Sequence, residues 1–223
     1  MAGQMSWSSF VTIPLSALLL IACSTTVYRD YSKIVAVTGT DAKVYRQTIR
    51  FPGLTLTIIP LNQMTRAAYM GLFVLPIPIA FFEKTPAMHG VFGIKVVLAP
   101  GTEQFGLDPG KVFLQWGSNE RRAPLGYRQI DPLSSNGARV WRSRRPNDKI
   151  PVKQSVCLVL EFPTPTLEPD TSFSIAIEGL EHNDRPLPVT TVRFEKASAW
   201  RYTAHLGFKD FVFGSAGGDS DCM

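Results

Sequence analysis

The feature that most constrains the fold is a repeated alternation of apolar and polar residues with a period of two. Leu54, Leu56 and Ile58 would share one face of an extended segment, and threonines occupy the positions between them. Because successive side chains of a strand point to opposite faces, this pattern predicts half-buried β-strands. The same alternation recurs in residues 92–98, 112–116, 156–162, 173–177, 190–194 and 200–204.

Turn-forming residues separate these segments, and no stretch after residue 30 carries an apolar helical stripe over three turns. Residues 156–162 are apolar on both faces, since Cys157 and Val159 alternate with leucines, which indicates a central strand. Together the patterns predict a mostly β fold after an N-terminal hydrophobic signal segment. We expect an antiparallel β-sandwich, immunoglobulin-like in the loose architectural sense, although a closed barrel would satisfy the same pattern.

The amino terminus contains an uncharged apolar segment, residues 10–22, directly before Cys23. This segment is shorter than the roughly 20 residues of a spanning helix and is typical of the apolar region of an export signal. Its end, Leu20-Ile21-Ala22-Cys23, resembles the lipobox of bacterial lipoproteins. Residues 1–22 lack the Lys or Arg of an ordinary export signal, so a core helix and an uncleaved signal anchor stay open as alternatives.

The resemblance implies signal cleavage after Ala22 and a diacylglycerol thioether on Cys23, with further acylation such as palmitate. It also implies an outer-membrane location facing the periplasm, because Ser24 rather than Asp follows the cysteine. The remaining chain resembles uncharacterised proteobacterial envelope lipoproteins, a likeness that supplies no activity. The expected organisation is a signal peptide (1–22), a tether (23–32), a β-sandwich domain (33–213) and a disordered tail (214–223).

A second apolar stretch, residues 67–82, carries no charge and contains Pro76 and Pro78. It is too short for a comfortable membrane-spanning helix, and the prolines would break one. Alternating prolines favour an extended backbone. The favoured interpretation is a buried connection or an edge segment over the core. The alternatives are an exposed apolar loop that contacts a membrane or a partner, and a second spanning segment.

The net charge of +5 is concentrated between residues 121 and 153, where nine cations face two acids. Arginine near an aromatic side chain can recognise phosphate or sugar, and Trp141 lies within this run. The candidate anion-binding residues are Arg139, Arg142, Arg144 and Arg145. Possible partners are anionic lipid, lipopolysaccharide or an envelope protein, and nucleic acid is not expected for an exported chain. A solvated loop is the commoner explanation of such a run.

Cys157 and Cys222 could form a disulfide in an exported compartment. We favour the simpler interpretation, in which Cys157 is a small hydrophobic residue of the core and Cys222 a separate thiol.

The sequence contains three histidines in no metal-ligand spacing and none of the common hydrolase, metalloprotease or nucleotide-binding motifs. Residues 181–184 hold possible acid–base groups, but their place between two strand patterns predicts a hairpin turn. We therefore expect no cofactor, metal or catalytic residue. The expected function is a non-catalytic binding or structural role in the envelope. The alternative is an envelope hydrolase or glycan-modifying enzyme that uses dispersed carboxylates.

Overall fold

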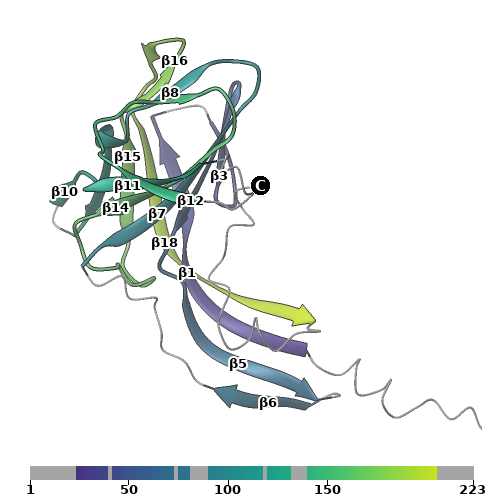
Figure 1. Cartoon of the computed structure of the whole chain (residues 1–223). Coiled ribbons are helices and arrows are strands. Elements are labelled where there is room, and N and C mark those ends of the chain that lie inside the picture. Colours follow the sequence, from purple (N-terminus) through teal and green to yellow (C-terminus); the bar gives the residue numbers. More distant parts are fainter. Residues whose placement is uncertain are drawn as a thin grey trace, which may run out of the picture.

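The computed structural model describes residues 24–39, 42–72, 75–80, 90–117, 120–131 and 140–204. These residues form antiparallel strands almost throughout (Figure 1). Within the described ranges there is one short 3-10 turn, Pro109–Lys111, and no α-helix. No described helix is long and apolar enough to cross a membrane.

The described strands belong to three antiparallel sheets. Sheet A has the order β10 (Glu120–Arg122), β9 (Val112–Trp116), β15 (Phe173–Ile177), β18 (Thr190–Ala204), β1 (Ser24–Thr38), β5 (Met64–Leu72) and β6 (Leu75–Ala80). Sheet B has the order β12 (Val140–Arg144), β11 (Gly126–Asp131), β14 (Val156–Phe162), β7 (Phe92–Pro100), β4 (Leu54–Pro60), β3 (Thr48–Phe51) and β2 (Lys43–Tyr45). Sheet C has the order β13 (Ile150–Val152), β8 (Phe105–Leu107), β16 (Leu180–His182) and β17 (Arg185–Pro186).

Sheets A and B enclose the hydrophobic core with the faces that the alternating pattern predicts. In β4, Leu54, Leu56 and Ile58 are buried while the residues between them are half-exposed. Between the sheets, the rings of Phe173 of sheet A and Phe92 of sheet B pack perpendicular to each other, with 5.5 Å between centroids. Sheet C adds Leu107, Ile150 and Leu180 to the same core. The predicted mostly β sandwich is confirmed.

Strand β14 is central, as predicted. It pairs with β11 on one side and β7 on the other, and Val156–Leu160 are all buried. Cys157 is buried too, but it is disulfide-bonded. The expectation of a free thiol at this position is therefore wrong. The apolar neighbours of Cys157 suggested an unreactive core residue, but its sulfur is bonded to a second cysteine.

Strands β1 and β18 extend well beyond the two packed sheets. They pair from Ser24 opposite Ala204 to Thr38 opposite Thr191, and only their inner part, with Ile34 and Phe194, belongs to the core. Their outer part, together with β5 and β6, projects from the body as a four-stranded sheet (Figure 1). We call this projection the ribbon (residues 24–30, 64–72, 75–80 and 198–204). From Ser24 onward, the expected tether is part of β1.

The apolar stretch 67–82 forms most of the hairpin β5–β6 at one edge of sheet A. The backbone is extended, as the alternating prolines predict. The segment lies at a sheet edge, but in the projecting ribbon rather than over the core, so that part of the favoured interpretation is wrong. Residues 73, 74, 81 and 82 lie outside the described residues.

Candidate functional site

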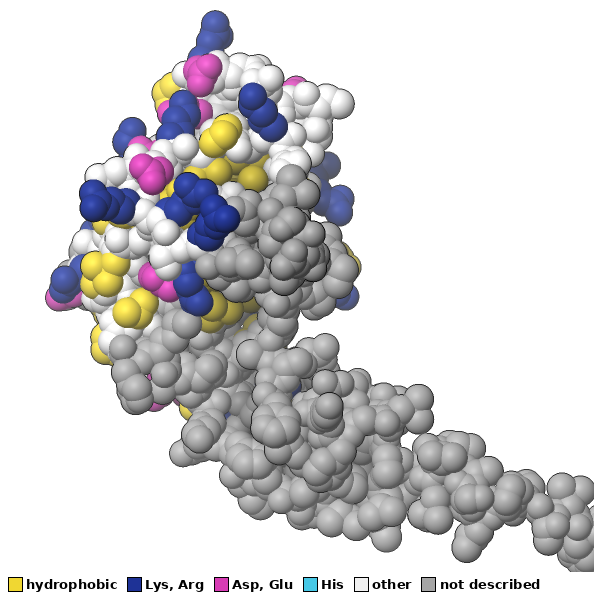
Figure 2. Space-filling model, viewed as in Figure 1, with side chains coloured by type: hydrophobic (Ala, Val, Ile, Leu, Met, Phe, Trp, Pro, Cys, Tyr) yellow, Lys and Arg dark blue, Asp and Glu magenta, His cyan; other side chains and the backbone are white. Residues whose placement is uncertain are grey.

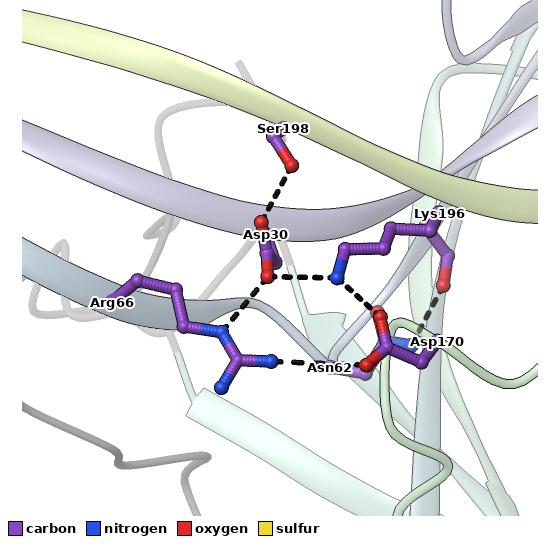
Figure 3. Close-up of polar contacts among 7 residues, drawn as sticks. Asp30, Asn62, Arg66, Asp170, Lys196 and Ser198 are labelled. Atoms are coloured by element: carbon purple, nitrogen blue, oxygen red, sulfur yellow. Dashed lines mark hydrogen bonds and ion pairs between the residues drawn. The ribbon is translucent and has the colours of Figure 1, made fainter.

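A cluster of charged side chains lies where the ribbon joins the body (Figure 3). Asp30 of β1 stands directly opposite Ser198 of β18, and only 3% of its surface is exposed. Its Oδ1 accepts a 2.6 Å hydrogen bond from Ser198 Oγ, and its Oδ2 accepts one of 2.8 Å from Arg66 Nε. The Lys196 ammonium lies 3.2 Å from the same Oδ2. Three groups from the strands on either side of β1 therefore surround this one carboxylate.

Burial by itself raises the pKa of Asp30, but hydrogen bonds from Ser198, Arg66 and Lys196, with the charge of Lys196, lower it below its ordinary value overall. Asp30 is therefore ionised at neutral pH. Lys196 also contacts Asp170, 2.5 Å from its Oδ1, and bonds to Asp170 and Asp30 raise the pKa of Lys196. Lys196 and Asp170 thus continue the cluster from the ribbon to the loop before β15.

Asn62 ties the same loop to β1. It is fully buried, and its Nδ2 donates to Ser32 Oγ at 2.8 Å and to the Leu167 carbonyl at 3.0 Å. A buried amide with such partners holds its neighbours in one arrangement, because leaving it unpaired costs about 1–3 kcal/mol. The cluster and Asn62 together fix the base of the ribbon against the body.

The tip of the ribbon is the first described part of the chain after the expected acylation site. Ser24 pairs with Ala204 on one side and with Gly71 on the other, one residue before the end of β5. Cys23 and Ala22 lie outside the described residues, yet Cys23 is covalently joined to Ser24. The register therefore places Ser24 at the same end of the ribbon as Gly71 and the end of β5.

Three of the four candidate arginines lie within the described residues. Arg142 and Arg144 lie on β12, an edge strand of sheet B, where they share a face and are exposed. Arg145 follows the end of this strand and is also exposed, and Arg139 lies outside the described residues. Residues 140–144 are therefore a strand rather than the loop that the basic run suggested.

Several other cations of the basic run are paired with acidic side chains. Arg128 Nε lies 2.6 Å from Glu161 Oε1, and Arg122 pairs with Glu120 on the same strand. Arg121 pairs with Glu178 and stacks on the ring of Phe113 at 3.6 Å. Basic side chains on the visible face of the body are accordingly interspersed with acidic ones (Figure 2). Because basic and acidic side chains are mixed, the positive electrostatic potential of this surface is weaker than the sequence alone suggested.

A shallow cavity of about 330 Å³ lies at sheet C, on a different part of the body from the ribbon. Phe105, Lys149, Lys153 and Asp184 are among its lining residues. The Lys149 ammonium contacts both Glu181 and Asp184, and hydrogen bonds to these two carboxylates raise the pKa of Lys149. The charges around the cavity are thus largely compensated by one another.

The polar run 181–184 forms the predicted turn. Asn183 and Asp184 have positive φ angles of 49° and 60° and connect β16 to β17. Such angles at both central residues are the geometry of a two-residue hairpin turn that asparagine and aspartate tolerate. His182 stacks on Phe105 and places its Nε2 2.9 Å from Glu103. In the described part of the chain, no group of His, Cys, Asp and Glu is arranged to hold a metal ion.

Sequence reasoning missed the cluster at the base of the ribbon. Its members are spread over most of the chain: the pairing of β1 with β5 and β18 brings Asp30, Arg66 and Lys196 together, and the loop before β15 adds Asp170. The one available signal was an acidic residue, Asp30, within a segment rich in tyrosine and valine. No family model matches this chain, and neither a curated protein nor a solved structure is significantly similar to it.

Proposed function

We propose that the protein is a lipid-anchored component of the bacterial cell envelope whose β-domain has a binding or structural role without catalysis. The single observation that carries this proposal is the register at the ribbon tip. Ser24, the residue after the expected acylated cysteine, begins a strand and pairs with Gly71 and Ala204. Acyl chains on Cys23 would therefore hold the ribbon tip, including the apolar β5–β6 connection, at the bilayer surface.

The ribbon also sets the distance between the membrane and the body. About ten residues of β1 separate Ser24 from Ile34 in the core, which corresponds to roughly 33 Å at the rise of a strand. The charged cluster at Asp30 and the buried Asn62 keep the ribbon from swinging freely. A body held in this way can present its far surface, including sheet C, to a partner in the periplasm.

The charge pattern favours binding over hydrolysis. A carboxylate that acts as a general acid or base must be able to exchange a proton with the substrate. Around the cavity, Glu181 and Asp184 both contact Lys149, and Glu103 contacts His182. The alternative function, an envelope hydrolase or glycan-modifying enzyme, would need carboxylates that can exchange protons with a substrate. The three carboxylates at this cavity are held in ion pairs instead.

The proposal is tested with Cys23→Ala in the natural host or a Gram-negative substitute. The unmodified protein should fractionate with membranes and give an N-terminal peptide whose mass includes acyl chains. The variant should leave the membrane fraction or accumulate as a heavier, uncleaved precursor, because the thioether requires this sulfur. An unmodified Cys23 within an intact amino terminus would end the lipoprotein proposal.

The matched control is Ser24→Asp, which retains the cysteine and changes only its neighbour. By resemblance to Gram-negative lipoproteins, this variant should remain acylated and move from the outer to the inner membrane. Membrane separation on a density gradient measures the change. If Ser24→Asp and the unmodified protein divide equally between the two membranes, the outer-membrane assignment is contradicted. The proposal that Cys23 is acylated is not affected by that result.

A further inference from the structure

The outer face of sheet B, which points away from sheet A, is buried at its centre, over β7 and β14, while the residues of β4 on this face are half-exposed. Cys157 and Val159 of β14 are 8% and 4% exposed, and Val97 of β7, directly opposite Cys157, is 9% exposed. The strands that β14 contacts most extensively are β7 and β11, its neighbours within the same sheet. Since sheet A covers only the other face, this burial requires a cover from outside the described strands.

The same face carries a buried lysine. Lys95 stands directly opposite Val159 and is 4% exposed. An ammonium group is rarely buried to this extent unless it is paired, because taking it out of water is costly. A segment that covers this face would bring apolar side chains to Val97 and Val159, and an acidic group on it would be favourable near Lys95.

The disulfide of Cys157 identifies this segment, because the chain contains only two other cysteines, Cys23 and Cys222. Cys23 is excluded by distance. Phe194 stacks on Phe173, Phe173 contacts Phe92, and Phe92 pairs with Phe162, so these four residues lie at one level of the sandwich.

Ile34, the partner of Phe194 on β1, lies ten strand residues from Ser24 in the direction of the ribbon tip. Phe162 lies five strand residues from Cys157 in the opposite direction. Fifteen residues of strand correspond to roughly 50 Å. A disulfide needs its two Cα atoms within about 7 Å. Cys23, one residue from Ser24, cannot meet that requirement, whereas Cys222 can.

The C-terminal segment has the length and chemistry for this face. Cys222 lies eighteen positions after Ala204, and an extended chain of that length reaches roughly 60 Å. The segment contains apolar residues at Leu206, Phe208, Phe211, Val212 and Phe213. Acidic residues stand next to its cysteine, at Asp219 and Asp221, and could neutralise Lys95.

We propose that residues 205–223 return from the ribbon tip in an extended course and cover the outer face of sheet B, where a Cys157–Cys222 disulfide fastens them. Each thiol loses one proton and one electron when the Sγ–Sγ bond forms. Both electrons pass by thiol–disulfide exchange to a disulfide oxidant of the exported compartment. The inference rests on the proposed function only for this oxidising location. It also leaves Cys23 as the one cysteine available to the lipid.

The test is a tryptic map of the full-length protein, purified from membranes with its thiols blocked and no reductant. Cleavage after Lys153, Arg193 and Lys209 should give peptide 154–193 joined to peptide 210–223, because the Arg185–Pro186 bond resists trypsin. Reduction should separate the two. In the native protein, cleavage after Lys209 should be at least tenfold faster for Cys222→Ser, since its tail is no longer fastened.

Cys23→Ala is the matched control. It should lose the lipid mass but retain the joined peptides, whereas Cys222→Ser should retain the lipid and lose them. The joined peptides test the disulfide, and the lipid mass tests the anchor. Failure of this inference can therefore be told apart from failure of the proposed function. A free Cys157 thiol, a link from Cys157 to Cys23, or a disulfide between two chains would each overturn the inference. So would a Lys209 cleavage rate that Cys222→Ser leaves unchanged.

Discussion

At the scale of single residues, Asp30 is the most informative position in the molecule. A carboxylate in the middle of a strand is unfavourable unless its charge is compensated, and here three side chains compensate it. Because Arg66 and Lys196 are themselves partly exposed, the pair with each is weaker than a fully buried ion pair. The cluster therefore fixes orientation more than it adds net stability.

We expect Asp30→Asn to lower the free energy of unfolding by about 1–3 kcal/mol at pH 7, the typical value of hydrogen bonds to a charged group. The pKa of Asp30 is lowered on folding, so its carboxylate stabilises the protein above the unfolded pKa of about 3.9. That contribution is lost as the pH falls through the lower folded pKa. Urea denaturation at pH 7 and at pH 3 should show a difference between variant and parent that shrinks in acid.

Asp170→Asn is the comparison for this experiment, because Asp170 contacts the same two cations but half of its side chain is exposed. We expect it to change the free energy of unfolding by less than about 0.5 kcal/mol, as for exposed ion pairs. If Asp170→Asn lowers the free energy of unfolding as much as Asp30→Asn does, the burial of Asp30 does not explain its contribution to stability.

The core position Leu160 tests the central place of β14. It is 1% exposed and pairs with Tyr127 and Ile94 on its two sides. Leu160→Ala should lower the free energy of unfolding by about 2–5 kcal/mol, since it removes apolar contacts and leaves a cavity. Leu125→Ala, at a position 60% exposed, should cost under about 0.5 kcal/mol. Equal costs in guanidinium denaturation would show that Leu160 is not in a packed core.

At the scale of elements, the hairpin β5–β6 shows how an apolar stretch can occupy a sheet edge. Of the strands described in sheet A, β6 is the last on its side, and its Pro76 and Pro78 are two residues apart. Proline has no N–H, so the pairing with β5 is best preserved if both proline nitrogens point outward from the sheet. An edge without these donors is a poor template for another strand.

Replacing both prolines by valine should therefore restore an edge that pairs with other chains. We expect Pro76→Val/Pro78→Val to shift the protein from its parental size to larger, concentration-dependent species in size-exclusion chromatography with light scattering. Pro186→Val is the control, because its strand β17 has only two residues. An unchanged size for the double variant would mean that the prolines do not protect this edge.

Apart from β14, which is apolar on both faces, the elements predicted from alternation were those whose two faces differ in chemistry. Val112 and Leu114, or Phe173 and Ile175, face the core at every second residue, and the sequence shows this directly. The long strand β1 was not predicted, because its outer half has no apolar core to alternate against. For the same reason the basic run around Arg142 read as a loop, although it forms edge strand β12.

At the scale of the whole molecule, the candidate site depends on pairings between the two ends of the chain. Ser24 lies opposite Ala204, and Asp30 opposite Ser198. Local patterns carry no information about such register, which is set by the packing of both strands on the same core. The lipobox resemblance thus rests on four residues, whereas the surface that the proposed anchor would bring to the membrane follows only from the fold.

The fold separates the two surfaces that could bind lipid. The ribbon tip lies roughly 33 Å beyond the level of Phe194, by the rise of ten strand residues. Arg144 pairs with Tyr127, whose other neighbour is Leu160, so the arginines of β12 belong to the body. At physiological salt the Debye length is about 8 Å. A bilayer at the ribbon tip would therefore hardly attract these arginines.

The last prediction separates the two surfaces with residues 24–223, which lack the lipid, and vesicles of neutral or anionic phospholipid. We expect binding at the ribbon tip through apolar contact, which salt weakens little, so Leu75→Ser/Ile77→Ser should reduce binding to both vesicle types. Arg142→Glu/Arg144→Glu should change binding at physiological salt less than twofold and leave the thermal midpoint unchanged, since exposed charges add little stability. Cosedimentation measures both. The opposite pattern, in which charge reversal abolishes binding to anionic vesicles and the tip variant binds normally, would place the lipid-binding surface on β12 and require the body to lie flat on the membrane.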